Sequence, residues 1–147
     1  MPKEHQKFVI SQKGILMRAG KCLIMKIRLV ENDRASLKWD LPGGRVDVRE
    51  NVDDAFVREI KEETGLIYFR DLGVVGYKSK VPRDSDKFPP FCGIIRLIEN
   101  EKDPVKMSFE HIEMRWITEA EVNDYNYCWE DMPEMIKKGF ELYKKVR

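Results

Sequence analysis

Alternating apolar and polar positions predict that much of this chain forms β-strands. Ala19 and Gly20 interrupt the longest alternating segment and predict a hairpin turn within it. Between the strands we expect a polar loop at 31–36 and an irregular loop at 82–90, where three prolines exclude regular structure. The predicted strands cover residues 7–11, 14–30 on both sides of the hairpin turn, 37–41, 73–81, 91–99 and 114–117.

Helical spacing of apolar residues appears in two longer segments. The first begins after Asn51, a residue suited to the N-cap, and ends before Gly65, which suits the residue just past a helix. The second follows Asp131, another candidate N-cap, and a single helical turn is predicted from Thr118 to Val122. Mixed strands with one helix on each side predict an α/β fold, an α/β/α sandwich with a mixed β-sheet.

Length and charge narrow the classes of function. A chain of 147 residues suits one domain spanning 1–147. Its 27 Lys and Arg nearly balance 26 Asp and Glu, so we expect neither a nucleic acid polymer nor a membrane as partner. The three cysteines lack the spacing of a disulfide framework or a zinc site, and the N-terminal residues lack a signal peptide. These features favour a cytoplasmic protein.

An acidic cluster near the end of the first predicted helix carries the chemistry. Glu59, Glu62 and Glu63 are spaced i, i+3 and i+4, which brings three carboxylates onto one side of the helix. The three carboxylates continue the helix face that begins with apolar residues, where further core residues would be expected. They also lie near the C-terminal end of the helix, where the negative end of the helix dipole disfavours anions. An ordinary solvated acidic face is the alternative, but a bound divalent cation would remove these penalties together.

The surrounding residues resemble the Nudix box of the Nudix (MutT-like) hydrolases. In that pattern a Gly is followed after five residues by Glu, and after seven more by Arg-Glu-apolar-any-Glu-Glu-any-Gly-apolar. The segment 44–66, GRVDVRENVDDAFVREIKEETGL, meets every fixed position, and the preceding residues 39–44, WDLPGG, resemble the usual approach to the box. The resemblance implies the Nudix-type α/β/α sandwich and hydrolysis of a nucleoside diphosphate linked to a further group.

The same resemblance implies roles for individual residues. Glu59, Glu62 and Glu63 match the metal ligands, with Mg²⁺ as the expected cofactor and Mn²⁺ as a substitute. Gly43 and Gly44 match the loop that approaches a phosphate, although they also suit a simple turn. The structural ion pair of the box matches Glu50 and Arg58, with Asp54 as a rival partner for Arg58.

The attacking water also needs a base that removes its proton. Residues 108–116, SFEHIEMRW, resemble the stretch in which many family members place a further glutamate. By that resemblance Glu110 is the preferred general base or additional ligand, and Glu113 is the second choice. Glu62 and Glu63 remain alternatives from within the box. His111 is interpreted as an ordinary loop residue.

Aromatic residues that could stack on a base are found in several segments, although such residues also fill cores. The stretch 128–131, CWED, loosely resembles the Trp and acidic pair of some oxidised-purine triphosphatases of the family. Trp39, Trp129 and Asp131 are therefore the predicted base-binding residues, and Phe88, Phe91 and Trp116 are further stacking candidates.

These resemblances imply a nucleotide as the small-molecule substrate and allow a homodimer. A MutT-type pyrophosphohydrolase acting on ribonucleoside or deoxyribonucleoside triphosphates is the first hypothesis. A pyrophosphatase for ADP-ribose or a nucleotide sugar is the second, and Pro82 resembles a proline associated with that group. A Nudix module that binds nucleotides without catalysis is the third.

Overall fold

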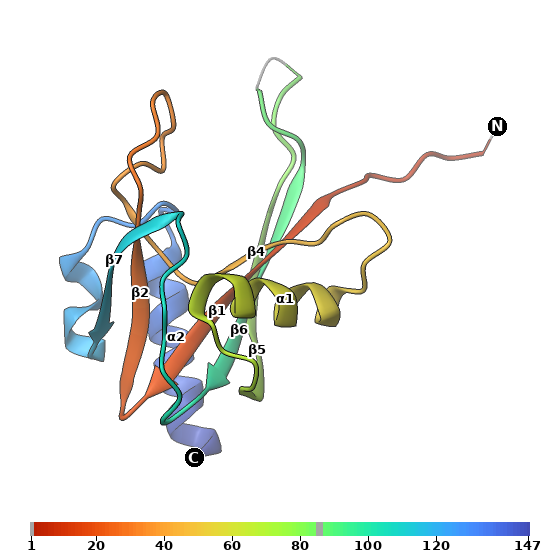
Figure 1. Ribbon diagram of the computed structural model, residues 1–147. Coiled ribbons are helices and arrows are strands. Elements are labelled where there is room, and N and C mark those ends of the chain that lie inside the picture. The colour runs from red at the N-terminus through yellow and green to blue at the C-terminus, as the bar shows by residue number, and fades with distance from the viewer. Residues whose placement is uncertain (1, 85–86) are drawn as a thin grey trace.

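A seven-stranded mixed sheet lies between two helices in the computed structural model, which describes residues 2–84 and 87–147 (Figure 1). The strand order is β3-β2-β1-β6-β5, with β4 paired to β1 and β7 paired to β2. Of these pairs, β1 and β6 are parallel and the others are antiparallel. The strands are β1 (Val9–Arg18), β2 (Lys21–Ile27), β3 (Trp39–Asp40), β4 (Gly43–Arg45), β5 (Arg70–Lys80), β6 (Phe91–Glu99) and β7 (His111–Ile117).

The helices are α1 (Val52–Thr64), the 3₁₀ helix η1 (Glu119–Asp124) and α2 (Met132–Val146). Helix α1 ends as predicted, because Gly65 takes the left-handed conformation and its N–H donates to the carbonyl of Lys61. Thr118 and Glu121 form a reciprocal capping box at the start of η1. None of the helices among the described residues is long and apolar enough to cross a membrane.

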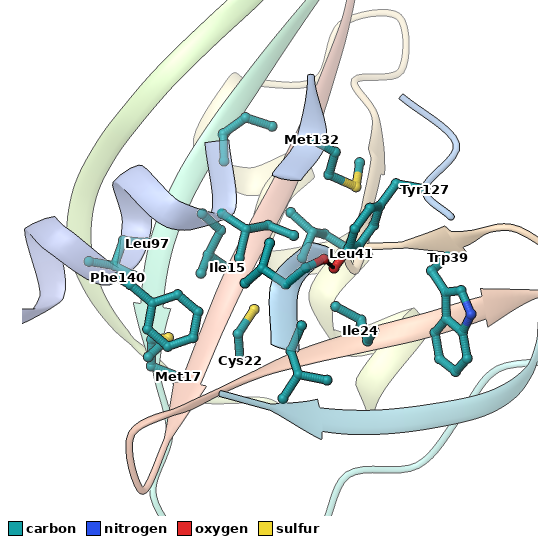
Figure 2. Packing of buried hydrophobic residues seen from close by; sticks show 14 of the residues in the cluster. Ile15, Met17, Cys22, Ile24, Trp39, Leu41, Leu97, Tyr127, Met132 and Phe140 are labelled. Atoms are coloured by element: carbon teal, nitrogen blue, oxygen red, sulfur yellow. Dashed lines mark hydrogen bonds between the residues drawn. The ribbon is translucent and has the colours of Figure 1, made fainter. Parts of the chain in front are cut away.

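Successive side chains of β1 point to opposite faces of the sheet and so contribute to both hydrophobic clusters of the core. Leu16 faces α1 and packs with Phe56 and Ile60, whereas Ile15 and Met17 face α2 and pack with a second cluster that includes Phe140 (Figure 2). The predicted α/β/α sandwich with a mixed sheet is therefore confirmed.

Several predicted boundaries were wrong. Residues 9–18 form one strand, because the polar residues Gln12 and Lys13 find partners inside the protein instead of marking a break. Strand β2 ends at Ile27, and 43–45 form the additional strand β4. Strands β5 and β7 both begin three residues earlier than predicted, at Arg70 and His111. Ser85 and Asp86 of the predicted 82–90 loop lie outside the described residues.

Two predicted helix caps also differ from the structure. Neither Asn51 nor Asp131 makes a side-chain cap hydrogen bond, although each occupies the N-cap position. The amide of Asn51 instead donates to Asp54, and Asp131 pairs with Lys78 of β5. Asp131 therefore links the start of α2 to the edge strand of the sheet.

Candidate active site

Helix α1 carries the acidic cluster against β4. Glu63 is almost buried, with 8% of its side chain exposed, and Glu59 is 17% exposed one turn earlier. The backbone N–H of Gly43 donates to Oε2 of Glu63 at 3.3 Å. Glu62 differs from both, because its side chain is 57% exposed. The predicted trio therefore consists of two carboxylates turned towards β4 and one carboxylate at the surface.

The glycines of β4 allow this close packing. A β-carbon on Gly44 would lie 2.2 Å from Cδ of Glu59, and one on Gly43 would lie 1.9 Å from the carbonyl oxygen of Gln12. Gly43 also has φ of 150°, which other residues rarely adopt. The two glycines thus bring the backbone directly onto the carboxylate of Glu59 and onto β1.

Arg58 connects the acidic residues. Its guanidinium donates to both oxygens of Glu50, at 2.7 and 2.9 Å, and also to Glu59 and Glu62. The hydrogen bonds from Arg58 and from the backbone of Asp47 lower the pKa of Glu50 to about 2. Arg58 therefore pairs with Glu50, while the rival candidate Asp54 bonds to Asn51.

Burial leaves the inner carboxylates short of positive charge. Desolvation, together with the negative charges of Asp40 and Glu110, raises the pKa of Glu63 to about 8 against the opposing effects of Lys13 and the Gly43 N–H. Desolvation also raises the pKa of Glu59, against the opposing effect of Arg58. These two groups favour a nearby cation, and their oxygen atoms are the donor type that Mg²⁺ and Mn²⁺ prefer.

The carboxylates suit a cation by their oxygen donors and their negative charge, but they are not arranged as a set of metal ligands. Over residues 2–84 and 87–147, no three Asp, Glu, His or Cys side chains stand together in an arrangement that could hold a metal ion. Arg58 occupies oxygens of both Glu59 and Glu62. Ligation by the trio therefore requires these side chains to come closer together around the cation.

A cavity of about 590 Å³ opens beside these glutamates. Glu59, Glu63 and Glu110 line it, together with Arg45 and His111. Glu110 lies in the exposed turn just before β7, and its charge contributes to the raised pKa values of Glu59 and Glu63. The structure thus brings Glu110 to the same cavity as two of the three box glutamates.

His111 is a buried strand residue and not the loop residue expected. Its Nε2 lies 3.9 Å from Oε2 of Glu63, and burial lowers its pKa, which favours the neutral imidazole. Its Nδ1 is buried and has no hydrogen-bond partner among the described residues. His111 therefore adds a neutral polar ring beside Glu63.

Aromatic side chains also line the cavity. Trp129 and Phe91 lie 6.4 Å apart between ring centroids with planes tilted by 35°, and Phe88 lies on the same lining. Trp129 fits against β6 because residue 93 is glycine, where a β-carbon would lie 2.6 Å from the indole. The predicted stacking residue Trp129 is therefore on the cavity, together with Phe91.

Other predicted site residues lie elsewhere. Trp39 belongs to the core cluster on the α2 side (Figure 2). Its ring packs edge-on against Tyr125. Asp131 pairs with Lys78, and Glu113 pairs with Arg115 at 2.7 Å. None of these three lines the cavity, and neither does Glu62. Trp39 and Asp131 thus do not have the placement expected for base-binding residues.

Sequence reasoning missed an ion pair on the cavity wall. Lys13 of β1 donates to Oδ2 of Asp40 at 2.7 Å, with 12% and 10% of the two side chains exposed. Burial lowers the pKa of Lys13, but the carboxylates of Asp40 and Glu63 outweigh it and raise the pKa above its usual value. The ammonium is therefore charged. The signal in the sequence that could have indicated this pair was a lysine followed by a run of apolar strand residues.

Comparisons with known proteins agree with this geometry. The family model described as the NUDIX domain matches residues 12–138. A Methanocaldococcus jannaschii ADP-ribose pyrophosphatase is 43% identical over 58 residues, which is 40% of this chain and 32% of that protein. A Bacillus subtilis protein named for 8-oxo-dGTP diphosphatase activity is 70% identical over 27 residues, 18% of each chain. The matched segments thus span a third or less of these relatives.

The fold has solved counterparts. The crystal structure of a MutT protein from Methanosarcina mazei superposes with a TM-score of 0.74 at 24% identity, covering 97% of this chain and 99% of that one. The family model covers most of the chain, including the box glutamates and the strands that line the cavity. This chain is a member of the Nudix hydrolase family.

Proposed function

We propose that this protein is a Mg²⁺-dependent nucleoside triphosphate pyrophosphohydrolase of the MutT type, with Mn²⁺ as a substitute. The supporting observation is that one cavity is lined both by the carboxylates of Glu59, Glu63 and Glu110 and by the aromatic rings of Phe91 and Trp129. A polyphosphate needs the first set, through a cation, and a base needs the second. The products are a nucleoside monophosphate and pyrophosphate.

Glu59, Glu62 and Glu63 are the proposed ligands, and the raised pKa values of Glu59 and Glu63, caused mainly by burial, support this role. When bound, the cation supplies charge neutralisation and polarises the diphosphate oxygens. Gly43 and Gly44 lie on the cavity lining and are the proposed phosphate loop. Arg45, whose guanidinium has no ion-pair partner among the described residues, supplies a positive charge on the cavity lining.

Glu110 is the proposed general base, which removes a proton from the attacking water. Its position in an exposed turn on the cavity lining supports this role. Glu62 and Glu63 remain the alternatives. Burial favours the protonated form of Glu63 without a cation, so Glu63 suits a ligand better than a base. Glu50 and Arg58 hold the loop before α1 against the helix.

A substrate panel with identified products tests the proposal. The protein is incubated with Mg²⁺ or Mn²⁺ and with nucleoside triphosphates, ADP-ribose and nucleotide sugars, and the products are identified by phosphorus NMR. Pyrophosphate together with a monophosphate supports a triphosphate pyrophosphohydrolase. Nucleotide binding without product across the panel would instead support a non-catalytic Nudix module.

A pyrophosphatase for ADP-ribose or a nucleotide sugar is the second candidate. The Methanocaldococcus jannaschii relative named ADP-ribose pyrophosphatase favours it, because the similarity extends over 58 residues. The Bacillus subtilis relative favours the triphosphate reaction over a shorter segment of 27 residues. In the same panel, release of a sugar phosphate and a nucleoside monophosphate identifies the second candidate.

A further inference from the structure

Lys13 and Asp40 form an ion pair for which the proposed reaction has no use. Both residues lie on the cavity lining, on β1 and β3, and the pair is largely buried at a distance of 2.7 Å. Lys13 Nζ also lies 6.0 Å from the centroid of the Trp129 ring. The pair therefore stands beside the aromatic wall.

Stability alone explains this pair poorly. Removing two charges from water costs about as much as their attraction returns, so a buried ion pair can often be replaced by apolar residues without loss of stability. Most of the surrounding strand interior is apolar, since Ile15, Leu16 and Met17 follow on β1 and are fully buried. The charges on the cavity wall therefore suggest a polar ligand group beside them.

Both partners retain hydrogen-bonding capacity. Oδ1 of Asp40 accepts from the N–H of Leu41, and Oδ2 accepts from Lys13, each at 2.7 Å. A carboxylate oxygen can accept a second bond, and an ammonium has three donors, of which the bond to Asp40 uses one. The pair can therefore offer a cationic donor next to an anionic acceptor on the cavity wall.

We propose that Lys13 and Asp40 determine base specificity by reading a carbonyl oxygen next to a ring N–H, the lactam edge of a base such as guanine or hypoxanthine. The ammonium of Lys13 donates to the carbonyl, and the carboxylate of Asp40 accepts from the ring N–H. Guanine adds a neighbouring amine that can also donate to Asp40. This inference rests on the proposed function, because it assumes that the base enters the cavity beside Trp129.

The charges oppose the alternative edge. Adenine carries an amine next to an unprotonated ring nitrogen. In the same orientation, the amine faces the ammonium and the nitrogen lone pair faces the carboxylate, so both contacts are repulsive. Turning the base over restores two hydrogen bonds, but it moves the glycosidic nitrogen, and with it the ribose and phosphate, to the opposite side of the edge. Adenine can therefore pair with both charged groups or keep its phosphate where a guanine nucleotide places it, but not both, and a site built to pair polar groups discriminates against a ligand that leaves them unpaired.

Calorimetric titration with GMP, IMP and AMP tests the inference without turnover. The wild type should bind GMP and IMP at least about tenfold more tightly than AMP, in line with one well-formed polar pairing. The double variant Lys13→Met with Asp40→Asn removes both charges of the pair together, so neither partner is left buried without the other, and it should fold and lose this preference. Lys78→Met is the matched control, because it breaks a Lys–Asp pair of 3.0 Å with Asp131 outside the cavity.

Equal binding of the three nucleotides by the wild type would overturn the inference, and so would an unchanged preference in a folded double variant. Hydrolysis of GTP and ATP is measured on the same samples. A base preference that depends on the pair, without hydrolysis, supports the inference and contradicts the proposed function. Hydrolysis without such a preference supports the proposed function and contradicts the inference.

Discussion

The carboxylate of Glu59 lies directly against the backbone of Gly44, where an added β-carbon would approach Cδ of Glu59 to 2.2 Å and Oε2 to 2.4 Å. Gly44 therefore positions a proposed metal ligand by being small. The contact joins β4 to α1 at the cavity.

Gly44→Ala should displace Glu59 and lower turnover by about a hundredfold, because a misplacement of about 1 Å at a reacting centre has effects of that size. Activity with Mg²⁺ and circular dichroism are the measurements. Gly76→Ala is the matched control, since its added carbon would meet only the flexible side chain of Met135, at 3.3 Å. Equal activity of the two variants would contradict the positioning role.

Glu110→Gln should lower turnover by about 10²- to 10⁴-fold with the fold intact, because the amide cannot accept the proton of the attacking water. Single-turnover kinetics with saturating Mg²⁺ measure the effect. Glu119→Gln, which changes a surface residue paired with Lys144, serves as the control. Near-normal turnover of Glu110→Gln would move the role to Glu62 or Glu63.

Adding Mn²⁺ to protein treated with EDTA should raise the melting temperature, because an ion that binds only the folded state stabilises it. The gain is about 2.7 kcal/mol at a hundredfold excess over the dissociation constant. The double variant Glu59→Gln with Glu63→Gln should lose this response. Glu130→Gln with Glu134→Gln, near the start of α2, should retain it. A response that survives in the first variant would place the cation elsewhere.

Glu99 should make the free energy of unfolding depend on pH. Burial raises its pKa, but the hydroxyl of Tyr143 and the guanidinium groups of Arg147 and Arg70 outweigh burial and hold the pKa below its usual value. The folded chain therefore binds fewer protons than the unfolded chain between the two pKa values. Its contribution to stability is present above the unfolded pKa and is lost as the pH falls through the folded pKa.

Urea unfolding of the wild type and Glu99→Gln at several pH values measures this contribution. The destabilisation should be about 1–3 kcal/mol at neutral pH, as for a buried charged hydrogen bond, and should shrink under acid conditions. Tyr143→Phe should reproduce part of the effect, because it removes one donor to Glu99. A difference that stays constant with pH would contradict the assignment.

The sequence predicted correctly those strand and helix ends that are set by residues next to them in the chain. Strand β6 has the predicted bounds, since prolines precede Phe91 and polar residues follow Glu99. Helix α1 ends at Gly65 because that residue can take the left-handed conformation. The box pattern likewise identified Glu59 and Glu63, both of which line the cavity.

Partners that are distant in the sequence explain what local signals could not predict. Gln12 bonds to the carbonyl of Val52, and Lys13 pairs with Asp40, so two polar residues lie inside β1 where the pattern indicated a break. Helical spacing grouped Glu62 with its neighbours, but Arg58 holds it at the exposed surface. Trp39 lies within the predicted strand 37–41, and the local pattern there could not distinguish a base-binding tryptophan from one that packs into the core against Tyr125.

The parallel pairing of β1 with β6 joins Val9–Met17 to Phe91–Glu99 and crosses the whole box segment. Such a distant pairing requires closure of a long loop, which slows folding. Lys13 and Glu59 approach each other through β4, but Trp129 packs on Gly93 of β6 and joins them only after this closure. A nascent chain that has emerged only as far as the box therefore carries the recognisable motif without a usable binding site, and competence arises late, when the last strands dock.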